Sequence, residues 1–258
     1  MRYEILGPLR VVDRDGSSSI SARKIEILLA ALLIRADHLV PADQLIAELW
    51  CDRPPRRATA GLHVYVSELR KFLGRPGGPD NRIVTRMPGY QLSLGSDEID
   101  AHAFLRLVDE GREHVRDDRR ADAAECFERA LGLWRGPVLG DPPTGPMVEA
   151  FGTWLTEVRM ECTEMLIDAQ LRLDRHRELV GRLYSLTAEH PLRESFHRQL
   201  MIALYRSERT ADALRVYQSA RRLLNTELGL EPCRALQDVH RAILTADDRT
   251  LLNAYAHA

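Results

Sequence analysis

From about Ile99 to the end of the chain, apolar residues recur at helical spacing almost without interruption. Such successive helices must bury their apolar faces against one another. The first two form a helical hairpin built on Leu105, Val108, Val115, Ala123, Ala124, Phe127, Ala130 and Leu131, and the later stretches are 147–173, 178–189, 192–206, 210–228 and 233–245. We therefore expect an all-α domain, with one sizeable loop at Gly136-Pro137 and Asp141-Pro142-Pro143.

An internal repeat refines this expectation. The pattern of small, aromatic and small residues over 121–130 recurs with identical spacing over 211–220, and a looser third unit covers 166–191. Small residues let the two helices of a pair approach closely, while the aromatic residues, Phe127 in the first unit, fill the gap between pairs. Gly111 stands where the first helix of a tetratricopeptide repeat carries its small residue. The pattern favours tetratricopeptide-like stacking over a generic helical bundle.

The first 96 residues have a different organisation, in which short strands flank three helices. Strands are expected at Tyr3–Ile5, Leu9–Val12 and 18–21, with a turn at Asp15-Gly16. Three helices follow: one from a Ser21 cap to Arg35, one from Pro41 to Pro54-Pro55, and one over 58–73 that Gly74 ends. The last two strands are expected at Arg82–Arg86 and Tyr90–Leu94. A link rich in Gly and Pro precedes the last hairpin. This order is that of a winged helix-turn-helix with an extra N-terminal β-sheet.

The fold class is therefore mainly α with small β, divided into a winged-helix domain at 1–96 and an all-α tetratricopeptide-like domain at 99–258. No apolar run is long enough to span a membrane, and no signal core follows Met1. The four cysteines are widely scattered, and the histidines outside the winged helix form no ligand motif. We expect a cytoplasmic, nucleoid-associated protein without a metal or a cofactor.

The formal net charge of −2 hides an asymmetry between the two parts of the chain. Residues 1–96 carry 14 Lys and Arg against 10 Asp and Glu, whereas the remainder has a net charge of −6. Within residues 53–86 there are eight basic residues and two acidic ones. A basic segment inside an acidic protein indicates a surface for a polyanion.

The third helix carries the residues expected to read DNA. Its predicted buried stripe consists of Leu62, Tyr65, Val66, Leu69, Phe72 and Leu73. The opposite face is small, polar and cationic, which suits the DNA major groove, and Arg86 at the hairpin tip is placed for a phosphate or a minor groove. The candidate DNA-binding residues are Arg56, Arg57, Thr59, His63, Val64, Ser67, Arg70, Lys71, Thr85, Arg86 and Tyr90.

Three residues near this face have two interpretations. Glu68 either pairs with Lys71 or Arg70, or accepts a hydrogen bond from a cytosine amino group. His63 is either a base contact or an incidental exposed histidine. Trp50 is either a core residue or places its ring against a DNA phosphate.

The sequence from Thr59 to Leu73 (TAGLHVYVSELRKFL), with IVTRMPGY at 83–90, resembles the recognition helix and wing of the OmpR-type winged helix in Streptomyces antibiotic regulatory proteins. LGLWRGP at 131–137, HPLRE at 190–194 and LGLEP at 228–232 resemble the bacterial transcriptional activator domain of that family. The resemblance covers essentially the whole chain. It implies binding to tandem repeats of double-stranded DNA upstream of biosynthetic promoters, as a possible homodimer on DNA, and recruitment of RNA polymerase with its sigma factor.

The most favoured function is thus a DNA-binding transcription activator, and no catalytic residues are expected, because no acid is paired with a nucleophile and a base. The sequence contains no Gly-x-x-x-x-Gly-Lys-Ser/Thr motif, and we expect no receiver domain before the winged helix. We therefore expect activity to follow protein abundance. Two alternatives stay open. One is a protein-interaction adaptor that uses the helical repeats, and the other is a repressor with the same mode of DNA binding.

Overall fold

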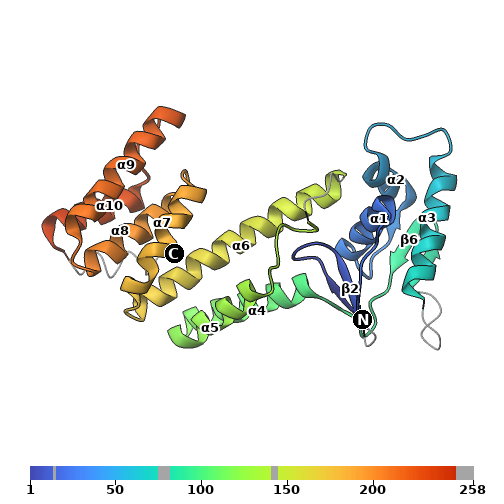
Figure 1. Cartoon of the computed structure of the whole chain (residues 1–258), viewed down its shortest axis with the longest axis horizontal. Helices are drawn as coiled ribbons and strands as arrows, with labels where there is room; N and C mark the ends of the chain where they lie inside the picture. The colour runs from blue at the N-terminus through green and yellow to red at the C-terminus, as the bar shows by residue number, and fades with distance from the viewer. Residues whose placement is uncertain (14–15, 75–81, 141–144, 248–258) are drawn as a thin grey trace. The chain divides into compact units, whose positions relative to one another are not determined.

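The computed structural model describes residues 1–13, 16–74, 82–140 and 145–247 (Figure 1). Four expected features lie outside these residues: the turn at Asp15, the link over 75–81, the loop at 141–143 and His257. The chain divides into two compact units. The first comprises Met1–Leu107 and Arg129–Met160, and the second comprises Val108–Glu128 and Glu161–Ala258. The expected division into domains at 1–96 and 99–258 stays a prediction.

A four-stranded sheet opens the first unit. Its strands are β1 (Arg2–Glu4), β2 (Arg10–Asp13), β3 (Gly16–Ser18) and β7 (Glu98–Ile99), in the order β3-β2-β1-β7. Tyr3 lies opposite Val11 in the antiparallel pair and opposite Ile99 in the parallel pair. The first two strands were predicted, but the return strand, expected over 18–21, lies at Gly16–Ser18 instead. The strand β7 was not predicted, because two residues give no periodic signal.

Three helices and a second sheet complete the winged helix. The helices are α1 (Arg23–Ile34), α2 (Ala42–Trp50) and α3 (Ala58–Leu73), and the strands β4 (Val40–Pro41), β5 (Ile83–Arg86) and β6 (Gly89–Leu92) pair in the order β4-β6-β5. In Figure 1 the three helices lie together beside β6. The predicted Ser21 cap is wrong. The first helix begins at Arg23 with Ala22 at its N-cap position and no side-chain cap.

The buried face of α3 is narrower than predicted. Leu62, Val66, Leu69 and Leu73 are buried at spacings of four, three and four residues, which follow one side of a helix. Phe72 is 36 % exposed because it lies at the edge of this stripe, so its assignment to the core is wrong. Tyr65 and Trp50 are half-buried, with ring centroids 5.9 Å apart. A Cβ atom at Gly61 would lie 3.2 Å from the ring of Trp50, which supports the core interpretation of that tryptophan.

A distant segment is hydrogen-bonded to the residues that follow β1. The backbone N–H of Arg135 donates to the carbonyl oxygen of Leu6 at 2.7 Å, and that of Leu139 donates to Ile5 at 3.0 Å. The guanidinium of Arg135 also lies 3.4 Å from the carboxylate of Glu4. Residues that follow the first helical hairpin are therefore bound to the N-terminal strands, which no local sequence pattern predicts.

Two buried carboxylates make further long-range contacts in the first unit. Asp100 accepts hydrogen bonds from the N–H groups of Ile5 at 2.8 Å and Leu6 at 3.1 Å. Burial raises the pKa of Asp100, while these N–H groups and Arg135 oppose that shift. Glu48, only 3 % exposed, accepts from the N–H groups at the start of α6 (Pro146–Arg172): Met147 at 2.6 Å and Val148 at 3.3 Å. A carboxylate there also meets the positive end of the helix dipole.

Replacing Glu48 with Ala is expected to lower the free energy of unfolding by about 2 kcal/mol, because two N–H groups lose their buried acceptor. Urea unfolding monitored by circular dichroism measures this change. Glu68→Ala is the matched control, since Glu68 is an exposed helical glutamate of the same unit. Equal unfolding midpoints for the two variants would contradict a stabilising role for Glu48.

The remaining helices match the periodic stretches closely. They are α4 (Asp100–Arg116), α5 (Arg120–Gly132), α6, α7 (His176–Glu189), α8 (Glu194–Arg206), α9 (Thr210–Leu228) and α10 (Arg234–Thr245). In the second unit α7 packs on α8, α8 on α9, and α10 on both α8 and α9. Among the helices of the described ranges, none is long and apolar enough to cross a membrane.

The small residue at Gly111 has the predicted role, although the ring of Phe127 packs against it within the pair of α4 and α5. A Cβ atom at Gly111 would lie only 2.4 Å from the ring of Phe127, so the glycine allows α4 and α5 to approach. In the second copy, the ring of Tyr217 stacks on His240 with centroids 3.8 Å apart. Two predictions for the first hairpin are wrong. Val115 is 39 % exposed, and Leu105 is half-buried because its neighbour Phe104 takes the core position.

Candidate nucleic-acid interface

The outer face of α3 is an exposed strip of small and polar side chains. Thr59, His63, Val64, Ser67 and Lys71 are all exposed, and their spacing places them on the side of the helix away from its buried stripe. Val64, an apolar residue of this strip, is 53 % exposed. The strip is therefore free to approach another surface closely.

Arg70 differs from its neighbours because it is half-buried and its guanidinium is held by hydrogen bonds to the hairpin. Its Nε and Nη2 atoms donate to the carbonyl oxygen of Ile83 at 3.0 and 2.8 Å, and Nη2 also donates to Thr85 Oγ1 at 2.7 Å. These bonds connect α3 to β5. The side chain thus fixes the hairpin against the helix.

Tyr90 lies beneath the strip. It is only 6 % exposed, its ring meets that of His63 edge to face at 6.5 Å, and the guanidinium of Arg70 lies 6.0 Å from its centroid. Burial raises the pKa of Tyr90, an effect that Arg70 partly offsets. The tyrosine therefore supports the two side chains above it, rather than standing on the surface with the other candidates.

The β5–β6 hairpin forms the wing and carries its exposed residues at the tip. Thr85 and Arg86 are exposed, and Met87 is 90 % exposed. Arg86 pairs across the hairpin with Gly89, whose position allows β4 to approach. A Cβ atom at Gly89 would lie 2.0 Å from the carbonyl oxygen of Val40, so this contact tolerates only glycine. The position of Arg86 thus depends on a tight strand pairing behind it.

The charges on this side of the first unit are largely uncompensated. Arg56, Arg57, Lys71 and Arg86 are exposed, and none forms an ion pair with a residue in the described part of the chain. Glu68 is also exposed and has no ion pair there, so its expected pairing with Lys71 or Arg70 is not formed. Four cations against one acid leave the strip, its entrance and the wing tip positively charged.

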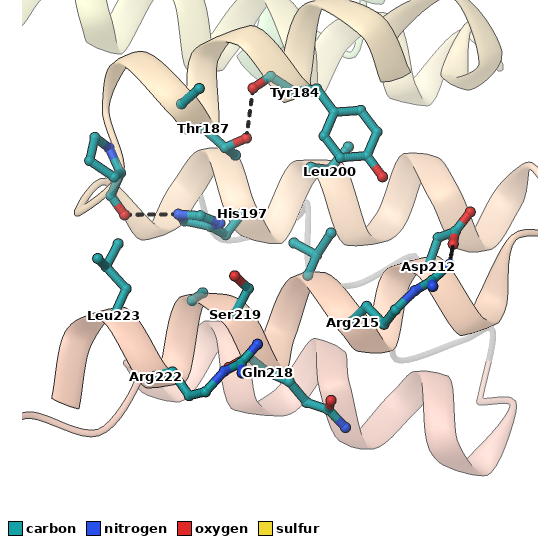
Figure 2. A pocket seen from close by; sticks show the side chains of 14 residues that line it. Tyr184, Thr187, His197, Leu200, Asp212, Arg215, Gln218, Ser219, Arg222 and Leu223 are labelled. Carbon is teal, nitrogen blue, oxygen red and sulfur yellow. Dashed lines mark hydrogen bonds and ion pairs between the residues drawn. The ribbon is translucent and has the colours of Figure 1, made fainter. Parts of the chain in front are cut away.

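A groove of about 690 Å³ lies in the second unit between α7, α8 and α9 (Figure 2). His197 Nε2 lies 2.9 Å from the carbonyl oxygen of Pro191 along its floor. Arg215 is paired with Asp212, and Arg222 Nε donates to the carbonyl oxygen of Gln218 at 3.4 Å. No sequence motif predicted this groove, because its walls come from three separate helices.

Among the residues that the structure describes, one group of possible metal ligands occurs, although no metal site was expected. The side chains of Glu110 and His114 on α4 and of Cys126 on α5 have ligand atoms within 4.8 Å of one another. The group was missed because its cysteine comes from the neighbouring helix.

Comparisons with known protein families match nearly the whole chain. The family model for the C-terminal domain of transcriptional regulatory proteins matches residues 18–92, and the model for the bacterial transcriptional activator domain matches residues 99–244. The first match contains α3 and the wing. The second begins at β7 and ends in α10.

Individual relatives agree with these matches. The regulatory protein DnrI of Streptomyces peucetius is 35 % identical over 253 residues, which cover 96 % of this chain and 93 % of that protein. The regulatory protein AfsR of Streptomyces griseus is 36 % identical over 248 residues, but the match covers only 25 % of its length. The solved structure of Mycobacterium tuberculosis EmbR, in complex with a low affinity phosphopeptide, superposes with a TM-score of 0.90 at 32 % identity. That match covers 99 % of this chain and 69 % of the EmbR chain.

Proposed function

The chain belongs to the Streptomyces antibiotic regulatory protein family, and we propose that it activates transcription by binding tandem repeats in duplex DNA and recruiting RNA polymerase. One observation carries the proposal for DNA: the outer face of α3 and the wing tip form an exposed surface with uncompensated cations. A DNA-binding activator of this kind would control the promoters of antibiotic biosynthesis. The similarity to regulatory proteins of Streptomyces supports that last step.

The proposed binding mode places α3 in the major groove. Thr59, His63, Val64 and Ser67 are small or planar enough for close approach, and they would meet base edges. Apolar contact of Val64 with a thymine methyl group accounts for an exposed valine on this face. Several base partners suit each of these side chains, so their identity does not fix the operator sequence.

The cations around the strip would contact phosphates. Arg56 and Arg57 stand at the entrance of α3, Lys71 stands near its end, and Arg86 reaches from the wing to a phosphate or the minor groove, with Thr85 beside it. Arg70 and Tyr90 act as positioning residues, because the first binds β5 and the second is buried beneath His63. These two would set the distance between helix and wing.

Direct repeats imply that two copies bind head to tail, so a homodimer on DNA is part of the proposal. Recruitment of RNA polymerase, including its sigma factor, would follow from protein contacts of the bound copies. In vitro transcription from a promoter beside the protein's own gene tests this step. Increased transcript supports activation, whereas decreased transcript with intact DNA binding would make the protein a repressor.

Lys71→Ala and Arg86→Ala are each expected to weaken binding to specific and random duplexes alike, because phosphate contacts carry no base information. Each substitution should also lower the salt dependence of binding by about one unit of slope. Fluorescence anisotropy with the full chain measures both effects. Arg234→Ala is the control, since this arginine lies in the second unit and its side chain is 94 % exposed. Wild-type affinity in both test variants would remove the proposed interface.

A protein-interaction adaptor is the second candidate, and the groove of Figure 2 favours it. An adaptor needs no duplex DNA, and its binding would depend on α7–α9 alone. Full-chain protein that binds no DNA at low salt, but still binds RNA polymerase, would support the adaptor over the activator.

A further inference from the structure

A second hollow in the helical unit has the size of a small-molecule site. Its volume is about 470 Å³, within the range of roughly 300–1,000 Å³ that is common for ligand pockets. The lining residues come from α4, the start of α5 and the last third of α6, all within the second unit. They are Arg112, Val115, Arg116, Arg120, Met165, Asp168, Ala169 and Arg172.

The lining combines an apolar surface with a cationic rim. Val115, Met165 and Ala169 supply apolar side chains, and the aliphatic parts of the arginines extend this surface. Val115 is 39 % exposed at the hollow, although it lies on a helix whose apolar residues are otherwise directed to the core. The exposed valine, which the sequence pattern assigned to the interior, is therefore accessible to a ligand.

Three arginines of the rim, Arg112, Arg116 and Arg120, form ion pairs with exposed acids. Arg112 contacts Asp109 at 3.0 Å and Glu161 at 3.1 Å, and Arg120 contacts Asp118 at 2.8 Å. These acids are more than half exposed, and such pairs contribute at most about 1 kcal/mol. An incoming anion could replace these partners at little cost.

The one acid in the lining is already engaged. Asp168 accepts a hydrogen bond from Gln199 Nε2 at 2.8 Å and lies 3.4 Å from the guanidinium of Arg198. The lining thus contains four arginines and one carboxylate, and that carboxylate already interacts with Gln199 and Arg198, which are not part of the lining. Guanidinium groups bind carboxylate, sulfonate and phosphate groups through paired N–H donors.

The groove of Figure 2 offers a weaker site for such a molecule. It is larger and lies open between three helices, and its Arg215 is bound by Asp212 within the groove itself. It therefore serves as an internal comparison for the smaller hollow.

We propose that the hollow between α4, α5 and α6 binds a small amphipathic anion, whose apolar body covers Val115, Met165 and Ala169 and whose anionic group meets the arginine rim. Displacement of water from the apolar surface provides affinity, and the arginines select for charge. The site does not depend on the proposed DNA binding, although its use as a regulator of transcription would rest on that function.

The test uses two fluorescent dyes that differ in one group. The anionic dye is 8-anilinonaphthalene-1-sulfonate, and the neutral dye, N-phenyl-1-naphthylamine, lacks the sulfonate. Both are titrated with the full chain, and fluorescence gives affinity and stoichiometry. We expect one saturable site with at least about tenfold tighter binding of the anionic dye, which corresponds to about 1.4 kcal/mol.

Three variants locate the site. Arg116→Gln combined with Arg120→Gln should remove the advantage of the anionic dye and leave the neutral dye unchanged, since glutamine loses the charge but keeps part of the aliphatic stem. Val115→Trp should weaken both dyes at least tenfold, since the larger ring fills the hollow from its exposed side. Ser219→Trp, placed in the groove of Figure 2, is the matched control and should change neither.

Several results would overturn the proposal. They are equal affinity of the two dyes for the wild-type chain, unchanged binding in the double arginine variant, or loss of binding in Ser219→Trp in place of Val115→Trp. Displacement of the anionic dye by duplex DNA would assign the arginines to nucleic acid instead. Because the arginine variants remove only surface groups, they test the proposal even if Val115→Trp fails to fold.

Discussion

Raising the salt concentration from about 50 to 200 mM is expected to weaken binding of the full chain to duplex DNA roughly a thousandfold. The proposed interface has exposed cations at the entrance of α3, along its strip and at the wing tip. If these residues and nearby backbone groups meet about six phosphates, the slope of log affinity against log salt is about −5. Release of condensed counterions from the duplex is the physical cause. Fluorescence anisotropy at a series of salt concentrations gives the slope directly.

The control for this measurement is Lys71→Ala, whose slope should be smaller by about one unit. A slope near zero for the wild-type chain would contradict the phosphate contacts. The full chain is needed, because a fragment of residues 1–98 would lack Arg135 and Leu139, which bond to the N-terminal strands. It would also lack Met147, the partner of Glu48.

Gly89→Ala is expected to lower the free energy of unfolding by about 3 kcal/mol or more, because overpacking against main-chain atoms cannot be relieved by a rotamer change. The added Cβ would lie 2.0 Å from the carbonyl oxygen of Val40 and 2.8 Å from Cα of Pro41. The pairing of β4 with β6 must open to accommodate it. We also expect weaker DNA binding by the fraction that remains folded, since Arg86 loses its fixed position across the hairpin.

Gly152→Ala provides the matched control for this substitution. Gly152 lies within α6 in the same unit, and a Cβ there would meet only Val138, at 3.9 Å. Alanine is a better helix former than glycine, so this variant should gain about 0.5–1 kcal/mol. Urea unfolding of both variants gives the comparison. Equal stability of the two would show that β6 does not require glycine at residue 89.

Local patterns in the sequence were enough to predict most of the elements. The helices of the second unit follow from apolar periodicity, and the close approach of α4 and α5 at Gly111 follows from the repeat. The long-range connections could not be predicted in this way. The bonds from Arg135 and Leu139 to the N-terminal strands join residues that are far apart in sequence, and the two residues of β7 give no periodic signal.

The candidate interface shows the same division. Exposure of Thr59, Ser67 and Lys71 follows from helical spacing, once the buried stripe is identified. The roles of Arg70 and Tyr90 depend on how the β5–β6 hairpin packs against α3. No local sequence pattern predicts that packing. The arginine rim of the hollow was missed for a similar reason, because α4, α5 and α6 contribute to it together.

Each of the two compact units is built from two separate segments of the chain. The chain therefore passes from one unit to the other three times, after Leu107, Glu128 and Met160. This interleaving limits how family members can be recombined. A hybrid regulator joined near residue 97 would take Glu48 from one parent and the start of α6 from the other. Similarly, Glu4 and Ile5 would come from one parent, while Asp100 and Arg135 came from the other. We expect such hybrids to lose stability unless these partners are transferred as sets. If α3 reads the operator as proposed, grafting its outer face alone is the safer way to exchange operator specificity.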